Sequence, residues 1–187
     1  MKKYIRIIGL FLVLIIMGVA YASINKNNKQ DINLHEETNI SMPSIAKNQS
    51  LTNWKFKDEN GKIFSLEELK GKVVFINLWA TWCPPCIAEM PSIDQLKKTF
   101  KDRDDLVFLM VDVDNNIEKA REWMKNKNID LPVHVSYTDI PRDIFQGSIP
   151  TTIIIDKKGN IAQRKLGASD YMSPDIIDSM KNLLNEK

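Results

Sequence analysis

The chain has 187 residues, of which 43% are hydrophobic and 8% aromatic, and its formal net charge is +2. This length allows one ordinary domain with extensions, and the apolar content excludes a chain that is disordered throughout. Lys2, Lys3 and Arg6 supply three of the positive charges, so the part from Ser23 onward carries a net charge of −1. That balance excludes the basic footprint of a nucleic-acid-binding protein.

The N-terminal segment has the pattern of an export signal. Its basic residues precede an uncharged run over residues 7–22, which ends in Ala20-Tyr21-Ala22, a small-residue cleavage pattern. The run is 16 residues long, shorter than the roughly 20 residues of a comfortable membrane span. The sequence therefore predicts a signal peptide or an N-terminal membrane anchor over residues 1–22. Either one places the rest of the chain outside the cytoplasm, in the periplasm or on the outer face of the membrane.

The following residues differ in composition from both the signal and the rest of the chain. Residues 23–50 are rich in Asn, Lys, Gln, Ser and Glu and contain few large apolar side chains. We interpret this stretch as a polar linker. One domain is then expected over residues 51–187.

Strand and helix patterns alternate through this domain. Two short strands are expected at residues 54–57 and 63–66, and a buried apolar strand follows at 73–79. A helix is expected from about Pro84 to about Lys101, where apolar residues recur every three or four positions. The remaining expected elements are strands at 106–113, 133–135, 151–156 and 160–165, and helices at 117–127, 139–145 and 174–184. This order predicts an α/β fold with right-handed crossovers and a terminal antiparallel hairpin.

Cys83 and Cys86 are the only cysteines of the chain, and they stand where the buried strand gives way to the helix. A pair at this spacing and place is typical of thiol–disulfide exchange. A structural disulfide closing so short a loop would add little stability. A structural zinc site needs about four ligands, and His134 is a lone histidine in an expected strand. We therefore expect redox chemistry, with no metal and no cofactor.

The helix N-terminus assigns different roles to the two cysteines. Unpaired backbone N–H groups and the helix dipole stabilise a thiolate at Cys83, which makes it the expected nucleophile. Cys86, one turn further in, is expected to resolve the mixed disulfide. Pro84 and Pro85 lack the N–H groups that could solvate this thiolate. We infer a comparatively reducing pair; the alternative is that both prolines only stiffen the start of the helix.

The sequence resembles the thioredoxin superfamily in Trp79–Cys86, in Pro91 and in the stretch Gly147–Thr152. Within it, the chain is similar to the exported TlpA/ResA/CcmG-type oxidoreductases. Asn77 stands where cytoplasmic thioredoxins carry a buried Asp, and Glu89 completes a Cys-x-x-Cys-x-x-Glu-x-Pro pattern. The resemblance implies a thioredoxin-like fold: a central mixed β-sheet flanked by helices, with an inserted helix–strand unit around residues 117–135 and an N-terminal β extension.

The resemblance also implies roles for residues near the cysteines. Glu89, one helical turn beyond Cys86, would relay a proton to or from it; the alternative is a solvated helix residue. A cis peptide bond is expected before Pro150, so that backbone groups of Ile149 can pair with a substrate strand. From its position next to the nucleophile, Trp82 is expected to line the docking surface as well as to contribute to packing.

The function that follows is reduction of disulfides in exported protein substrates, such as apocytochrome c, with electrons from a membrane thiol carrier. The membrane itself is a partner if the N-terminal segment is uncleaved. Two alternatives stay open: a disulfide oxidant or isomerase, and a non-catalytic copper-handling protein on the same fold. The sequence leaves the direction of electron flow undecided, because both directions use the same residues.

Overall fold

The computed structural model of the protein describes residues 51 and 53–186. The expected signal or anchor and the whole of the expected linker lie outside these residues. In the described part, no helix is long and apolar enough to cross a membrane. Its elements are, in chain order, β1 (Lys55–Asp58), β2 (Ile63–Ser65), the 3-10 helix η1 (Leu66–Leu69), β3 (Val73–Trp79), α3 (Pro84–Thr99), β4 (Leu106–Asp112), α4 (Ile117–Asn126), β5 (Val133–Ser136), β6 (Thr151–Ile155), β7 (Ile161–Leu166) and α5 (Pro174–Asn185).

The seven strands form one mixed sheet in the order β2-β1-β5-β4-β3-β6-β7. β3 pairs parallel with β4 and antiparallel with β6, and all seven of its residues are buried. Parallel neighbours need a crossover connection, which α3 supplies between β3 and β4 and α4 supplies between β4 and β5. The sheet confirms the expected α/β fold and the mixed arrangement.

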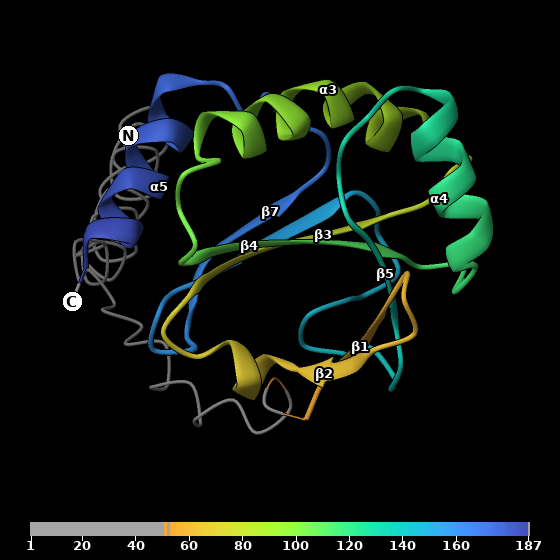
Figure 1. The fold of residues 1–187 in the computed structure, drawn as a ribbon, viewed down its shortest axis with the longest axis horizontal. Helices are drawn as coiled ribbons and strands as arrows, with labels where there is room; N and C mark the ends of the chain where they lie inside the picture. Colours follow the sequence, from red (N-terminus) through yellow and green to blue (C-terminus); the bar gives the residue numbers. More distant parts are fainter. Residues whose placement is uncertain (1–50, 52, 187) are drawn as a thin grey trace, which may run out of the picture. The chain divides into compact units, whose positions relative to one another are not determined.

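Side chains alternate between the two faces of the sheet, and each face has its own core. Phe75 and Trp79 of β3 pack with the helices α3, α4 and α5, whereas Val74, Ile76 and Leu78 pack on the opposite face. Figure 1 shows α3 and α4 on one side of β3 and β4, with the β1–β2 hairpin on the other. Residues of β3 with odd numbers therefore face the helices, and this rule places Asn77 toward α3.

The N-terminal β extension is the β1–β2 hairpin, which joins the far edge of the sheet. β1 pairs antiparallel with β5, and the indole Nε1 of Trp54 donates a hydrogen bond to Ser136 Oγ at 2.7 Å. Gly61 closes the hairpin turn with a φ of +83°, a conformation that glycine adopts without a Cβ penalty. The hairpin thus stands where the resemblance places it.

The prediction of a helix at residues 139–145 is wrong. The segment forms one turn instead, in which Ile144 N–H and Phe145 N–H both donate to the carbonyl of Pro141. The carbonyls of Asp143 and Ile144 accept from the guanidinium of Arg164 at 2.9 and 2.8 Å, so they do not continue a helical ladder. Tertiary contacts override the local pattern here.

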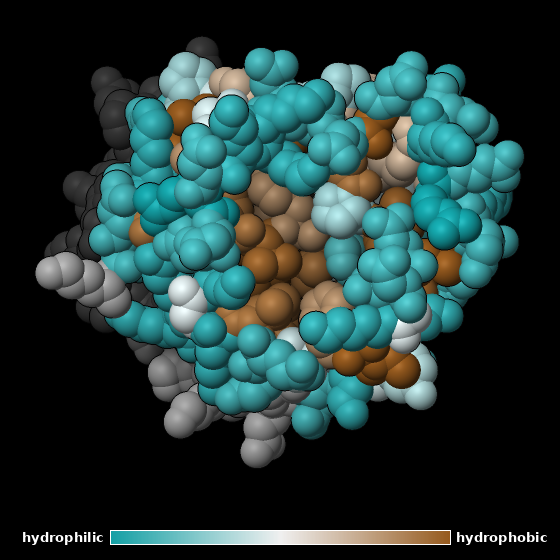
Figure 2. Space-filling model, in the orientation of Figure 1, coloured by the Kyte–Doolittle hydropathy of each residue, from teal (hydrophilic) through white to brown (hydrophobic). Residues whose placement is uncertain are grey.

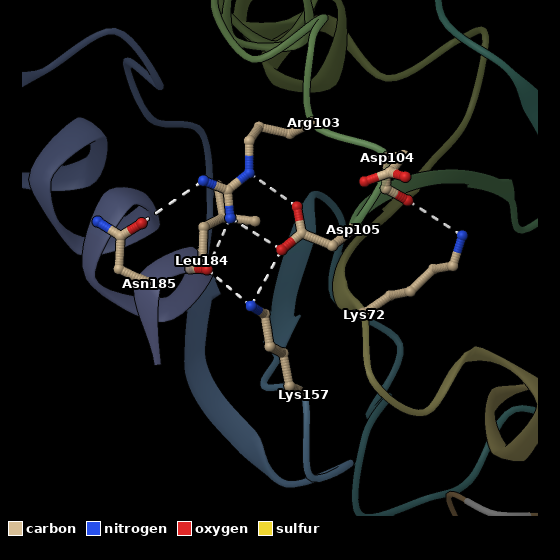
Figure 3. A network of polar contacts seen from close by, with 7 residues as sticks. All are labelled: Lys72, Arg103, Asp104, Asp105, Lys157, Leu184 and Asn185. Carbon is tan, nitrogen blue, oxygen red and sulfur yellow. Dashed lines mark hydrogen bonds and ion pairs between the residues drawn. The ribbon is translucent and has the colours of Figure 1, made fainter. Parts of the chain in front are cut away.

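An ionic network fastens the end of α5 to the sheet. Asp105 lies between the side chains of Arg103 and Lys157, at 2.8 and 3.0 Å. Both cations also donate to the carbonyl of Leu184, at 2.6 and 2.7 Å, as Figure 3 shows. Cations at a helix C-terminus satisfy unpaired carbonyls and the negative end of the dipole. The hydrogen bonds from Arg103 hold the pKa of Asp105 far below its ordinary value, and Lys157 lowers it further.

We expect Asp105→Ala to lower the free energy of unfolding by about 1–2 kcal/mol, because two cations lose their shared partner. A depressed pKa means that this stability is present above the ordinary pKa of 3.8 and is lost as the pH falls below it. Urea unfolding at neutral and acid pH measures both effects. The matched control is Asp104→Ala, an exposed neighbour; equal losses in the two variants would contradict the role of the network.

Candidate active site

The two cysteines lie at the junction between β3 and α3, as the sequence predicts. Cys83 is the N-cap residue of α3 and forms a disulfide with Cys86. The backbone N–H of Cys86 donates to Cys83 Sγ at 3.3 Å. Cys83 is 3% exposed and Cys86 is fully buried. The helix N-terminus therefore offers one N–H donor to the sulfur of the outer cysteine, which stabilises a thiolate there.

The side chains next to the disulfide face solvent. Pro84 and Pro85 occupy the first two positions of α3 and are exposed, which is where a helix tolerates proline. Trp82 is 60% exposed, and its Nε1 donates to Asp114 Oδ2 at 2.7 Å. A large aromatic ring thus stands fixed at the surface beside the cysteines.

The expected cis peptide bond between Ile149 and Pro150 is confirmed. The sheet brings it to the redox pair, since Thr151 lies opposite Leu78 in the β6–β3 ladder. Pro150 therefore comes next to the end of β3, from which the chain runs on to Cys83. Its carbonyl accepts a hydrogen bond from Gly167 N–H at 2.9 Å, so β6 and the β7–α5 connection are tied together at this corner.

Glu89 is buried on α3, with 2% of its surface exposed. Asn77 Nδ2 donates to one carboxylate oxygen at 2.7 Å, and Ser169 N–H donates to the other at 3.1 Å. Burial raises the pKa of Glu89 from 4.5 to about 7, and the two hydrogen bonds oppose this rise. The solvated alternative for this residue is wrong. A carboxyl group with a pKa near neutrality can both accept and release a proton in this range.

Glu89 belongs to a chain of buried polar groups that the sequence did not reveal. Asn77 Nδ2 also donates to Thr152 Oγ1 at 2.9 Å, and Thr152 Oγ1 shares a hydrogen bond with the hydroxyl of Tyr171. Burial raises the pKa of Tyr171 above its ordinary value, and the nearby Glu89 adds to the effect. The only sequence signal was a lone Asn in an apolar strand. Its partners lie on α3 and β6, and the sequence alone does not show that these two elements meet at Asn77.

We expect Asn77→Asp to destabilise the protein by about 2–3 kcal/mol at alkaline pH. Two carboxyl groups at hydrogen-bond distance cannot both ionise at low cost, so the loss should shrink as the pH falls and they are protonated. Urea unfolding over a pH series measures this. Asn77→Leu, which removes the amide without adding a charge, is the control. Asn77→Leu also removes a donor to the ionised Glu89, so both losses should grow toward alkaline pH. A loss that grows no more for Asn77→Asp than for Asn77→Leu would contradict the prediction.

Other polar residues noted in the sequence contribute to packing or to helix capping. His134 is buried in β5 and contacts Phe64 edge to face, with ring centroids 5.8 Å apart. Burial lowers its pKa to about 4. Asp112 Oδ2 accepts from Asn116 N–H, and Asn116 caps α4. Within the described residues, no three His, Cys, Asp or Glu side chains form a group that could hold a metal ion.

The chain is similar to known proteins. The pattern of the Redoxin family matches residues 41–180. The thioredoxin-like protein YneN of Bacillus subtilis is 30% identical over 156 residues, which is 83% of this chain and 87% of that protein. The thiol-disulfide oxidoreductase ResA of the same organism is 31% identical and covers 75% of this chain and 77% of its own length.

A solved structure agrees with the sequence relatives. A thiol:disulfide interchange protein of the thioredoxin family from Chlorobium tepidum is 31% identical and superposes with a TM-score of 0.57. The match covers 70% of this chain and 92% of that one. In this chain, the fold that it shares with that structure carries the Cys83–Cys86 disulfide at the N-terminus of α3. The chain belongs to the Redoxin family and is a thioredoxin-like thiol–disulfide oxidoreductase.

Proposed function

We propose that the chain reduces disulfides in exported protein substrates outside the cytoplasm. The observation that carries this proposal is the Cys83–Cys86 disulfide at the N-terminus of α3, together with the buried carboxyl of Glu89 on the same helix, whose pKa is raised to about 7. Cys83 attacks a substrate disulfide as the thiolate. Cys86 then attacks the mixed disulfide and forms the internal one, which releases the reduced substrate.

Glu89 supports this cycle as a proton donor and acceptor for Cys86, one helical turn away. A thiol must lose its proton before it attacks, and a carboxyl with a pKa of about 7 can take that proton at neutral pH. The same group returns the proton when the internal disulfide is reduced. Trp82 provides an exposed apolar surface for the substrate, and the backbone at Ile149 and Pro150 pairs with an extended substrate segment.

The electrons come from a membrane thiol carrier, and apocytochrome c is a fitting substrate class. The similarity to the thiol-disulfide oxidoreductase ResA of Bacillus subtilis supports this part of the proposal. The proposal that the chain is exported rests on the pattern of residues 1–22. An uncleaved N-terminal segment would hold the domain at the outer face of the membrane. A disulfide oxidant or isomerase is the second candidate, because it needs the same residues.

The reduction potential of the Cys83–Cys86 couple separates these two functions. Equilibration of the full chain with glutathione or thioredoxin buffers measures it. A value near about −270 mV or lower supports the reductase, whereas a value near about −120 mV would make the protein an oxidant. Stoichiometric copper binding by the reduced protein, without turnover on a protein disulfide, would favour the copper-handling alternative.

We expect Pro84→His to raise the reduction potential by about 30 mV or more. The variant adds a backbone N–H and an imidazole beside Cys83, and both stabilise the reduced thiolate form. Pro84→Ala is the matched control, because it restores the N–H without the imidazole and should give a smaller rise. An unchanged potential in both variants would mean that the prolines only stiffen the start of α3.

A further inference from the structure

β4 is paired on both edges over only part of its length. On one side it pairs with β3 from Leu106 to Asp112. On the other side its pairing with β5 begins at Met110, which lies opposite Val133. In the described part of the chain, no strand pairs with the outer edge of Leu106–Leu109. The start of β4 is therefore an open strand edge within the sheet.

The backbone groups on this open edge can be identified. Val73 N–H donates to the carbonyl of Asp105 at 2.8 Å, and Val113 N–H donates to the carbonyl of Trp79 at 2.9 Å. Successive residues of a strand point their backbone groups to opposite sides, so odd residues of β4 bond to β3. Leu106 and Phe108 therefore direct both N–H and C=O outward. In the β4–β5 register the carbonyl of Phe108 would accept from the N–H of residue 132, and Pro132 has none, so the ladder stops at this point.

A groove of mixed character runs along this edge. Apolar side chains form part of its lining: Phe100, Leu106, Val107, Phe108 and Pro132. Five cations also line it: Lys72, Lys97, Lys98, Lys101 and Arg103. Figure 2 shows a hydrophobic hollow in the middle of this face, over the start of β4 in the orientation of Figure 1, with hydrophilic residues around it.

The charges of the groove are mostly positive. Its lining contains only two carboxylates, Asp104 and Asp130, against five cations. Lys97 is paired with Asp130 at 2.8 Å. No carboxylate of the described residues forms an ion pair with Lys72 or Lys101, which line the groove beside the start of β4. Lys72 donates one N–H to the backbone carbonyl of Asp104 at 3.0 Å, so its positive charge, like that of Lys101, has no carboxylate partner and can attract an anionic one.

We propose that this groove binds an extended, acidic segment of a partner polypeptide, which adds a strand to the open edge of β4. A peptide backbone supplies the alternating donors and acceptors that Leu106 and Phe108 require, whereas a phosphate or a lipid headgroup supplies acceptors alone. Its apolar side chains cover Phe100 and Val107, and its carboxylates meet Lys72 and Lys101. His134 lines the same groove.

This site is separate from the redox pair. β3 and β4 run parallel, so the start of β4 and the cysteines lie at opposite ends of these strands, about 20 Å apart along seven residues. Binding in the groove therefore leaves Cys83 accessible. The competing explanation is that the lysines only prevent edge-to-edge association of the strand, and peptide binding distinguishes the two.

The test uses the full chain and a short capped peptide that alternates valine with aspartate. A peptide that alternates valine with asparagine is the neutral control. We expect saturable binding of the acidic peptide, with the amide resonances of Leu106 and Phe108 shifted and their hydrogen exchange slowed. Binding should weaken as salt is raised, because exposed charges contribute to it. Equal binding of the asparagine peptide, or no binding of either, overturns the proposal.

Variants assign the binding to the open edge. Lys101→Glu should weaken it at least about threefold, whereas Lys125→Glu, an exposed residue of α4 outside the groove, should not. Leu106→Pro removes one outward N–H at the first residue of the strand, a tolerated position, and should abolish binding; Leu106→Ala keeps the N–H.

Two further readouts complete the test. Disulfide reduction by Lys101→Glu should equal that of the wild type, so failure of the groove and failure of the redox function are distinguishable. Sedimentation should show no self-association through this edge. A dimer of the chain that Leu106→Pro dissociates would overturn the proposal, because the occupant would then be a second copy.

Discussion

Cys83→Ser is expected to reduce the rate of insulin disulfide reduction by at least about 10³-fold, to the background of the assay. Cys83 is the residue whose sulfur accepts the N–H of Cys86 at the helix N-terminus, at 3.3 Å. Serine has the same shape but no thiolate at neutral pH, so the attacking nucleophile is lost. Turnover with a thiol reductant, followed by insulin precipitation, measures this.

Cys86→Ser is expected to stop the cycle at a different point. Cys83 still attacks, but the fully buried Cys86 is no longer present to resolve the adduct. A covalent complex between protein and substrate should then accumulate, visible on a non-reducing gel and absent for Cys83→Ser. Thermal unfolding of both variants checks that they fold. If neither variant traps an adduct and both only lose stability, the disulfide is structural.

Glu89→Gln is expected to change how stability depends on pH. Glu89 has a raised pKa in the folded protein, about 7 against an ordinary 4.5. The stability that its protonation adds is fully present below the ordinary pKa and is lost as the pH rises through the folded value. Relative to the wild type, the variant should therefore gain on the order of 3 kcal/mol between about pH 4 and about pH 8.

Urea unfolding of the oxidised proteins over a pH series measures this difference. The side-chain amide introduced by Glu89→Gln can turn only one acceptor oxygen toward its two donors, Asn77 Nδ2 and Ser169 N–H. That cost does not vary with pH, so it does not change how the difference in the free energy of unfolding depends on pH. Glu122→Gln, an exposed residue of α4, is the control and should follow the wild type. A pH-independent difference between wild type and Glu89→Gln would show that Glu89 does not titrate near neutrality.

The framework of the fold could be predicted because its signals are local. The apolar run of β3 and the three-to-four residue spacing in α3 predict elements that begin and end within about two residues of the observed ones. Pro174 at the first position of α5 is another local signal that the structure confirms. The Cys-x-x-Cys spacing predicted thiol–disulfide exchange for the same reason, since both cysteines lie within one helical turn.

The environment of Glu89 could not be predicted, because its partners come from distant parts of the chain. Asn77 precedes Glu89 by 12 residues, and Ser169 follows it by 80. The rise of its pKa depends on burial, which only the packed structure determines. The helix prediction for residues 139–145 was wrong for a related reason. Arg164, on β7, donates hydrogen bonds to the carbonyls of Asp143 and Ile144, which a local helix would have used for its own backbone hydrogen bonds.

The pairing of β1 with β5 has a consequence for the order of folding. The hydrogen bond between Trp54 and Ser136 spans 82 residues, whereas β3, α3 and β4 follow one another directly along the chain. Closing a long loop costs entropy that later contacts must recover. During synthesis or translocation, β1 has no partner strand from the rest of the sheet until β5 has emerged. The N-terminal hairpin thus joins the rest of the sheet late, although β1 and β2 are the first strands of the sheet to be made.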